Sequence, residues 1–342
     1  MRESRLFFAA AFFSAASLPI ACAHTTGEIP APTVQETDRA PTRQATVRTT
    51  TTASDAASAP AAPAEPPVAA DPYADAAPIS AKSIGHTSYV LKVTLEGGFA
   101  AAYKPGSTLP LGKHRYKGEI AAYRLARALG LDNVPLAMPR AFSASALRGA
   151  FATPKGATDF DHKAIVDGAG FVHGALMPWI PDYRILPLEE DSWRARWESW
   201  LMNRATHVPD DQEALATSIS TMLLFDYVTA NWDRWSGGNV ARAGDEGRLL
   251  FVDNDGAFYE HPAREPLAAQ LTRIRRIVRF SRSFVASLRA LDDAKLRAAF
   301  GEETPGVPLL SDHVIADVES RIATVLGIVD ASINRQGDAG FD

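Results

Sequence analysis

The chain has 342 residues, enough for one large domain or two small ones, and its 40 acidic and 35 basic side chains give a formal net charge of −5. This balance argues against a nucleic-acid-binding protein, although a local basic patch could still exist. The eight histidines show no metal-ligand spacing, and the sequence contains no zinc motif, nucleophile elbow or internal repeat.

The first residues have the pattern of a secretory signal. Arg2 and Arg5 precede an apolar run, so we expect residues 1–21 to be a signal peptide. Cys22, the only cysteine, ends this run in Leu-Pro-Ile-Ala-Cys, which resembles a bacterial lipobox. An unpaired thiol in an exported protein needs a reason. We therefore expect a lipoprotein anchored to the membrane through Cys22, in the periplasm or at the cell surface. The alternative is cleavage after Ala23 and simple secretion.

Residues 22–79 have the composition of a disordered, lipid-anchored tether. From residue 24 to 79 the segment holds nine of the 23 prolines and many Ala and Thr, but no Lys, Phe or Trp. It cannot bury enough apolar surface to offset the entropy of ordering its backbone. Regular periodicity begins at Ser80, which predicts a folded domain over about residues 80–335. After the signal, no stretch reaches the ~18 apolar residues expected of a membrane helix.

The first part of the folded domain predicts an antiparallel pair of strands and a helix. Ser88–Leu95 and Phe99–Tyr103 read as strands joined by a turn at Gly97-Gly98, and Lys104 ends the second strand. Residues 118–130 read as a helix with a glycine C-cap. Its Glu119 lies on an inward face, where a carboxylate is costly without a cation. We expect an ion pair between Lys104 and Glu119.

Two further segments of this part are candidates for nucleotide contacts. The loop from Ile84 to Ser88 precedes the first clear strand, so its backbone N–H groups and the Ser88 hydroxyl could cover phosphates. A plain turn is the alternative. The apolar, proline-bounded segment 175–180 is typical of a connection between lobes. Its Met177 and Trp179 could line an adenine pocket, with ordinary core packing as the default interpretation.

The second part of the domain predicts mainly helices. Asp210 and Asp211 open a helical run so apolar that it must be buried. Residues 283–300 and 312–333 also have helical periodicity. Trp193, Trp197 and Trp200 recur at helical spacing, which indicates packing against the core. A cluster of arginines indicates a solvated or salt-bridged face, or alternatively a surface for an acidic substrate or anionic lipid; its members are Arg273, Arg275, Arg276, Arg279 and Arg282.

Two short motifs carry the chemistry. Asp233 and Asn239 follow the buried helix, and Asp253 ends the apolar run Leu249–Val252 before Asn-Asp-Gly-Ala-Phe. Phosphoryl transfer needs a carboxylate to orient the attacking hydroxyl, and a carboxylate and an amide oxygen to hold Mg²⁺ on the phosphates. Ordinary protein kinases place their Asp and Asn closer together, after His-Arg. The pattern therefore predicts an atypical kinase, with Asp255 as a further candidate metal ligand.

Each of these residues also has a structural alternative. Asp233 and Asn239 could be turn residues, and residues 253–256 could form a surface hairpin turn. A Ca²⁺ loop is a weaker alternative, because the remaining EF-hand ligands are missing.

The motifs together resemble the secretory-pathway kinases, a group that includes the Golgi casein kinase, the four-jointed kinases and the proteoglycan xylose kinase. More distantly they are similar to spore-coat, HipA-type and phosphatidylinositol-type kinases. The resemblance covers about residues 80–260 and rests on Tyr-Lys-Pro, Gly-Glu-Ile-Ala-Ala-Tyr, Asn-x-Asp-Arg and Asp-Asn-x-Gly-x-Phe. Trp235 stands where many of these kinases carry His, and the disulfides of the animal members are absent.

The resemblance implies a role for each candidate residue. Lys104 would contact the phosphates, Glu119 would pair with it or help to hold metal, Asp233 would be the catalytic base and Asp253 the metal ligand. Arg234 would turn toward the large lobe or toward a phosphate. The cofactors implied are ATP and Mg²⁺ or Mn²⁺.

The complete hypothesis is an α+β, two-lobed, protein-kinase-like fold. The small lobe, residues 80–180, would hold an antiparallel sheet and one helix, and the large lobe, residues 181–342, would be mainly helical. The protein would transfer the γ-phosphoryl group of ATP to a hydroxyl of a protein, peptide or carbohydrate. The alternatives are a nucleotide-binding pseudokinase without transfer and an envelope scaffold protein.

Overall fold

The computed structural model describes residues 73–85, 88–243 and 248–341. The expected signal peptide 1–21, Cys22 and the tether as far as residue 72 lie outside the described residues. The chain divides into one unit over Met1–Ala64 and a second over Glu65–Asp342, and all the described residues belong to the second. No helix in its described part is long and apolar enough to cross a membrane.

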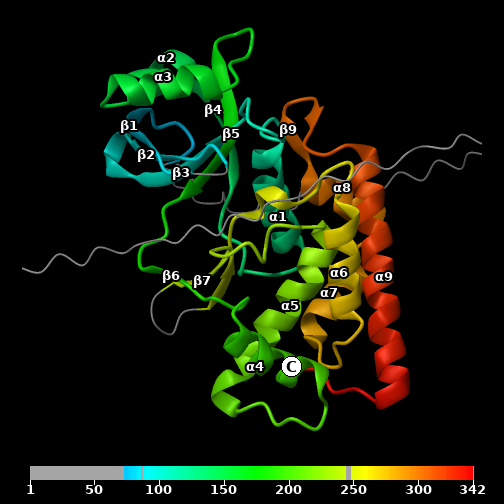
Figure 1. Cartoon of the computed structure of the whole chain (residues 1–342). Helices are drawn as coiled ribbons and strands as arrows, with labels where there is room; N and C mark the ends of the chain where they lie inside the picture. The colour runs from blue at the N-terminus through cyan, green and yellow to red at the C-terminus, as the bar shows by residue number, and fades with distance from the viewer. Residues whose placement is uncertain (1–72, 86–87, 244–247, 342) are drawn as a thin grey trace, which may run out of the picture. The chain divides into compact units, whose positions relative to one another are not determined.

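The small lobe is built on a five-stranded antiparallel sheet in the order β1-β2-β3-β5-β4 (Figure 1). Its strands are β1 Pro78–Ser83, β2 Leu91–Leu95, β3 Ala100–Pro105, β4 Met138–Ser143 and β5 Phe171–Pro178. In β2 the alternating Leu91, Val93 and Leu95 are fully buried, as expected of a strand with one face on a core. The expected domain start at Ser80 falls inside β1, whose edge position leaves only Ala81 buried and gives the sequence a weak signal.

The turn between β2 and β3 forms at Gly97 and Gly98, within the short 3₁₀ segment η1 Glu96–Gly98. Both glycines have positive φ, 85° and 84°, which glycine adopts without a steric penalty. The predicted hairpin is therefore confirmed. Strand β3 runs on to Pro105 and places Lys104 opposite Ala175 of β5.

The helix that carries Glu119 is α1 Arg115–Ala128, which begins one turn earlier than the sequence indicated. It contacts β3 and β5, but its apolar residues Ile120, Ala121 and Leu125 join the core of the large lobe. Two helices that the sequence analysis did not predict, α2 Ala144–Gly149 and α3 Pro154–Lys163, also belong to the small lobe. Helix α2 packs against β1, β4 and α3 (Figure 1).

The large lobe is mainly helical, with α4 Asp191–Met202, α5 Glu213–Thr229, α6 Arg264–Ile274, α7 Arg282–Ala290, α8 Asp293–Phe300 and α9 Asp312–Gln336. Helix α5 is almost wholly buried, as predicted, and contacts α4, α6 and α9 (Figure 1). Trp197 and Trp200 of α4 are buried in the same core, and Trp193 packs at its edge. The helical pattern 283–300 divides into α7 and α8 because Asp292 caps the N-terminus of α8.

Short strands and turns complete this lobe. One sheet has the order β6-β7-β8, with β6 Tyr183–Ile185, β7 Val240–Ala243 and β8 Leu249–Phe251. A hairpin joins β9 Glu302–Thr304 to β10 Val307–Pro308. The 3₁₀ turns are η2 Asp210–Gln212 and η3 Asn254–Gly256. The α+β class, with an antiparallel sheet in one lobe and mostly helices in the other, is thus as predicted.

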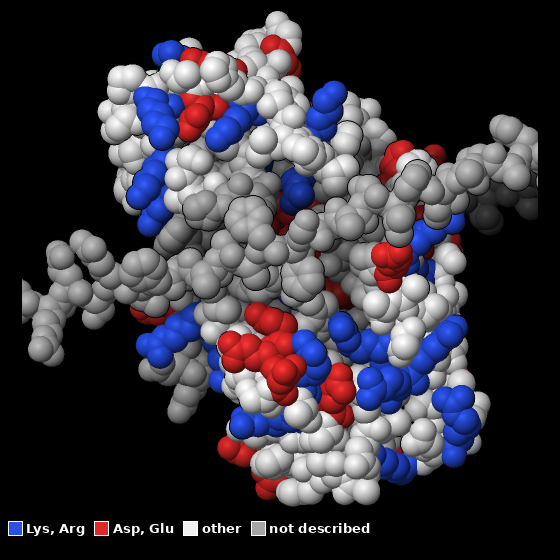
Figure 2. Space-filling model, in the orientation of Figure 1, with Lys and Arg blue, Asp and Glu red and all other residues white. Residues whose placement is uncertain are grey.

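The arginine cluster is largely engaged in contacts within the protein. Arg279 donates to three backbone carbonyls, and Arg276 pairs with Glu198. Arg273 lies over the ring of Trp235, with 4.5 Å from the guanidinium carbon to the ring centroid. On the face shown in Figure 2, acidic and basic side chains are interspersed. These contacts favour the salt-bridged interpretation of the cluster.

Candidate active site

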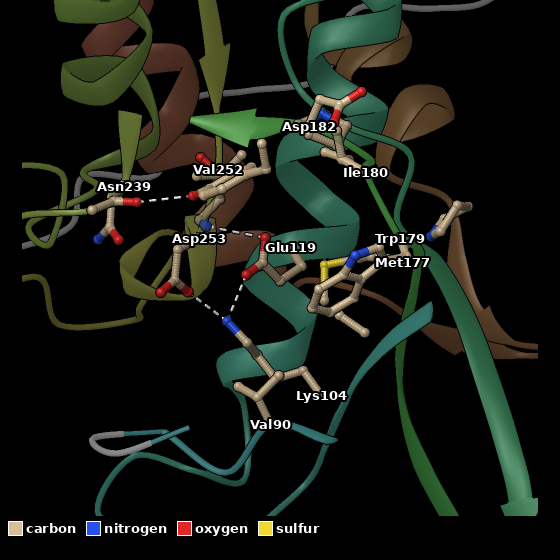
Figure 3. Close-up of a pocket in the computed structure, with 16 residues that line it drawn as sticks. Val90, Lys104, Glu119, Met177, Trp179, Ile180, Asp182, Asn239, Val252 and Asp253 are labelled. Atoms are coloured by element: carbon tan, nitrogen blue, oxygen red, sulfur yellow. Dashed lines mark hydrogen bonds and ion pairs between the residues drawn. The ribbon is translucent and has the colours of Figure 1, made fainter. Parts of the chain in front are cut away.

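A cavity of about 560 Å³ lies where residues of the two lobes meet (Figure 3). Its volume is in the range of small-molecule sites. One wall is apolar and includes Val90, Ala102, Met177, Trp179 and Ile180. The opposite end is polar, with Lys104, Glu119, Asn239, Asp253 and Asn254. A ligand with a flat apolar group and a charged group would match these two ends.

Lys104 is the centre of the polar end. Its Nζ lies 2.6 Å from Glu119 Oε1, 2.5 Å from Asp253 Oδ1 and 2.9 Å from Asp255 Oδ2 (Figure 3 draws the first two). The predicted ion pair between Lys104 and Glu119 is confirmed. Burial alone would lower the pKa of Lys104, but the three carboxylates hold that pKa well above its usual value. The lysine is therefore charged at any physiological pH.

Helix α1 and turn η3 approach each other closely enough to build this cluster. Oε2 of Glu119 accepts a hydrogen bond from the backbone N–H of Asn254 at 3.0 Å. The preceding residue, Gly118, has no side chain, and a Cβ there would lie 2.7 Å from the carbonyl oxygen of Asn254. Glycine is thus required at the contact that brings Glu119 to the end of β8.

Asp253 and Asp255, both predicted metal ligands, occupy different environments. The Asp253 side chain is 39% exposed and lines the cavity, whereas the Asp255 side chain is 1% exposed. Asp255 is held between Lys104 and Arg115, whose Nη1 lies 3.0 Å from its Oδ1. Asp253 is also in the left-handed backbone region, with φ 53°. Of the two, Asp253 is the one that a ligand in the cavity can reach.

Asn239 is the amide expected beside Asp253. It lines the cavity, and its Nδ2 donates to the backbone carbonyl of Asp233 at 2.8 Å. This bond leaves Oδ1 as the acceptor atom that could bind a cation. Carboxylate and amide oxygens are ligands that Mg²⁺ and Mn²⁺ accept. In the described part of the chain, no three His, Cys, Asp or Glu side chains are arranged to hold a metal by themselves.

The charge balance also suits a cation that binds together with phosphates. Glu119, Asp253 and Asp255 face two cations, Lys104 and Arg115, which leaves one formal negative charge in the cluster. The donor types and this surplus fit a divalent metal, which Asp253 and Asn239 would hold.

Asp233 lies in the loop after α5, beyond the residues that line the cavity. Its backbone N–H donates to Oδ1 of the buried Asn231 at 3.1 Å. A Cβ at Gly256 would lie 2.9 Å from the Cβ of Asp233, so this loop and η3 touch directly. Burial raises the pKa of Asp233 above its usual value. The loop therefore holds a half-buried carboxylate next to the Asp253 turn.

Arg234 fixes these two segments to each other. Its side chain is fully buried and pairs with Asp226 of α5 at 3.0 Å. It also donates to the carbonyls of Asn239 and Val252 and to Oδ1 of Asn254. Of the two orientations left open by the sequence, Arg234 takes the one toward the large lobe. Asp226 was not predicted as its partner, although a carboxylate in an apolar helix is a signal for a buried cation.

The remaining candidates are placed as follows. Met177 and Trp179 both line the cavity, and the ring of Trp179 is covered by Lys92, whose Nζ is 3.8 Å from the ring centroid. Ser88 is buried, and the described residues that line the cavity do not include it; residues 86 and 87 of its loop lie outside the description. Residues 254–256 are buried, so the alternative of a surface hairpin turn is wrong. Arg115 beside Asp255 was not anticipated.

Comparison with solved structures identifies proteins that have a similar fold. No family model matches the chain, and no curated protein matches it. The solved structure of the Golgi casein kinase matches 78% of this chain and 76% of its own, with 16% identity and a TM-score of 0.57. The same kinase with Mn/ADP bound matches 77% and 75%, with 15% identity and a TM-score of 0.57.

A third structure, hydra Fam20 with sugar, matches 78% of this chain and 88% of its own, with 17% identity and a TM-score of 0.58. The chain therefore has the fold of an atypical, Fam20-like kinase. At these identities the likeness concerns the fold, and the roles of individual residues rest on the geometry above.

Proposed function

We propose that this protein is an exported atypical kinase that transfers the γ-phosphoryl group of ATP to a hydroxyl of a protein, peptide or carbohydrate. The observation that carries the proposal is the convergence of Glu119, Asp253 and Asp255 on Lys104, at the charged end of a cavity with an apolar wall. Three separate chain segments meet there, which is the arrangement that phosphoryl transfer requires. The kinase-like fold supports the same reaction class.

In this proposal the adenine packs against the apolar wall that Val90, Ala102, Met177 and Trp179 form. Lys104 contacts the phosphates, and Glu119 keeps the ammonium in place. Asp253 and the Oδ1 of Asn239 hold Mg²⁺ or Mn²⁺. The metal supplies charge neutralisation on the phosphate oxygens. The Mn/ADP complex of the Golgi casein kinase is consistent with a divalent metal and does not select between the two ions.

Asp233 is the proposed catalytic base. Its loop is fixed by the Asn231 and Arg234 contacts, which hold the Asp233 backbone beside η3. There its carboxylate accepts a hydrogen bond from the acceptor hydroxyl and aims that oxygen at the γ-phosphorus. Positioning of this kind contributes more to the rate than ionisation of the hydroxyl does.

The test uses the full chain, because a truncation at residue 80 would cut β1. Purified protein is incubated with γ-labelled ATP, Mn²⁺ or Mg²⁺ and an envelope extract, with the Asp233→Asn variant as control. We expect a labelled acceptor only with the wild type, and ATP binding by both proteins. ATP binding without any labelling would favour the pseudokinase alternative. If neither protein bound ATP, the kinase proposal would be rejected and the scaffold alternative would remain.

We further propose that the protein is a lipoprotein anchored through Cys22. The proposal rests on the position of the sole cysteine at the end of the signal-like run and on the Pro-, Ala- and Thr-rich segment that follows. The tether would let the kinase domain reach acceptors away from the membrane surface.

A further inference from the structure

Arg115 is the first residue of α1 and lies one helical turn before Glu119, so both side chains project from the same face. Its side chain is 13% exposed. Nη1 is 3.0 Å from Asp255 Oδ1, while the other oxygen of Asp255 is 2.9 Å from Lys104 Nζ. Asp255 therefore binds two cations, one through each carboxylate oxygen. Lys104 lines the cavity, whereas Arg115 is not among the described residues that line it.

The same guanidinium lies beside the loop of the proposed base. Its central carbon is 5.9 Å from the ring centroid of Trp232, which directly precedes Asp233. Arg115 is also among the charges that lower the pKa of Asp233 against the effect of burial. Arg115 thus contacts the carboxylate cluster around Lys104 and lies near the loop that carries Asp233.

Most of the hydrogen-bonding capacity of Arg115 is unused. Its Nε is buried and has no partner among the described residues. The contacts of the described residues give its guanidinium one hydrogen bond, to Asp255, although arginine has five donors. A buried donor without an acceptor is costly, so a site with spare donors is suited to a ligand that brings acceptors.

The hydrogen-bond donors of Lys104, in contrast to those of Arg115, are all in use. Its ammonium has three donors, and three carboxylate oxygens already lie within hydrogen-bonding distance. A donor that Lys104 turns toward the nucleotide phosphates must leave one of these carboxylates, so the transferred group needs a further cation. In phosphoryl transfer the charge is spread over three equatorial oxygens of the moving group, and a planar guanidinium can bind two of them at once.

We propose that Arg115 is a catalytic residue that binds the γ-phosphoryl group during its transfer; this inference rests on the proposed kinase function. The acceptor oxygen forms a bond to the γ-phosphorus while the bond from that phosphorus to the bridging oxygen breaks. The electron pair of the broken bond stays on the β-phosphate of ADP, and the hydroxyl proton passes to Asp233. Arg115 remains protonated throughout and stabilises the equatorial oxygens.

A purely structural role, in which Arg115 only neutralises Asp255, makes a different prediction. Loss of the arginine would then disturb Asp255 and Lys104, and the affinities for ATP and ADP would fall together with stability. If Arg115 binds the γ-phosphoryl group, its loss weakens ATP binding selectively, because ADP lacks that group.

The experiment compares Arg115→Met and Arg115→Lys with Lys117→Met in the full chain. Lys117 lies in the same turn of α1, but its Nζ pairs with Glu303 at 2.8 Å. Calorimetric titration with Mn²⁺ gives the affinities for ATP and ADP, and transfer assays give kcat. We expect Arg115→Met to bind ATP about tenfold more weakly with ADP affinity unchanged, and to lose about 10²–10³-fold in kcat. Arg115→Lys should be intermediate, and Lys117→Met should equal the wild type.

Equal losses of ATP and ADP affinity in Arg115→Met, with a lowered unfolding midpoint, would overturn the inference in favour of the structural role. Wild-type affinities and kcat in that variant would overturn it as well. Failure of the proposed function is a separate result, because it requires that the wild type itself transfers nothing. The ratio of ATP to ADP affinity would still test the contact between Arg115 and the γ-phosphoryl group in that case.

Discussion

Substitution of Gly118 by alanine tests whether the close approach of α1 to η3 builds the site. The new Cβ would lie 2.7 Å from the carbonyl oxygen of Asn254, where ordinary contact begins at 3.4 Å, so α1 must move by up to 0.7 Å. The neighbouring atoms are backbone, which cannot rotate away. The same displacement would stretch the 3.0 Å hydrogen bond from Asn254 to Glu119 beyond useful length.

Two opposing terms set the stability of Gly118→Ala. Overpacking costs about 1–3 kcal/mol, and alanine gains about 1 kcal/mol over glycine in a helix. The free energy of unfolding should therefore fall by about 0–2 kcal/mol. Since misplacement by about 1 Å can cost ~10²-fold in rate, transfer should fall by ~10–10²-fold.

The matched control is Gly327→Ala in α9, where a Cβ would meet nothing within 4 Å. There we expect stabilisation of up to about 1 kcal/mol and unchanged transfer. Urea unfolding and labelled-ATP assays on both variants measure the difference. If Gly118→Ala were as stable and as active as Gly327→Ala, the contact between α1 and η3 would not determine the position of Glu119.

Three further predictions concern single residues. Asp253→Ala should abolish the thermal shift caused by ATP with Mn²⁺; an unchanged shift would show that Asp253 does not hold the metal. Asp233→Asn should keep ATP binding but lower transfer by ~10²–10⁴-fold. Because burial raises the pKa of Asp233, transfer by the wild type should decline on the acid side at a higher pH than for an exposed aspartate, and a profile without such a decline would argue against this base. Cys22→Ser should move the protein from the detergent phase to the soluble fraction; a soluble wild type beginning at His24 would refute the anchor.

The sequence alone identified site residues where a charged side chain stands in an otherwise apolar helix or strand. Glu119 on an apolar helix face predicted an ion pair with Lys104, and the two side chains meet. Asp253 after an apolar strand was predicted to hold a metal, and its contact with Lys104 was not foreseen. Periodicity also located β2, β3 and α1, since one face of each is buried, and a nearly continuous apolar run located α5.

The features that could not be predicted from the sequence depend on long-range contacts or have only weak periodicity. Arg234 could point toward a phosphate or into the lobe, and only the position of Asp226 on α5 decides between them. Helices α2 and α3 bury few side chains, Leu147 and Phe160, so their patterns are faint. Arg115 gave no signal, because an arginine at the start of a helix usually lies in solvent.

The effect of Lys104 on Asp253 can be measured separately from the effect of a metal ion bound there. In the cluster the ammonium lies 2.5 Å from Asp253, the carboxylate that is exposed to the cavity. A divalent cation that binds Asp253 would therefore lie next to the charged ammonium, whose repulsion opposes its binding. The ammonium is fixed in place, because Glu119 and Asp255 also hold the lysine.

Lys104→Met should consequently change stability and metal binding in opposite directions. Removal of one partner from a buried ion pair costs about 3–5 kcal/mol, since Glu119 then stays buried without its cation. Mn²⁺ alone can then bind the carboxylates without repulsion from the ammonium, so it should raise the unfolding midpoint of the variant more than that of the wild type. Thermal unfolding with and without Mn²⁺ measures this, with the exposed Lys82→Met as control. Equal Mn²⁺ shifts in Lys104→Met and wild type would mean that the ammonium does not oppose metal binding at Asp253.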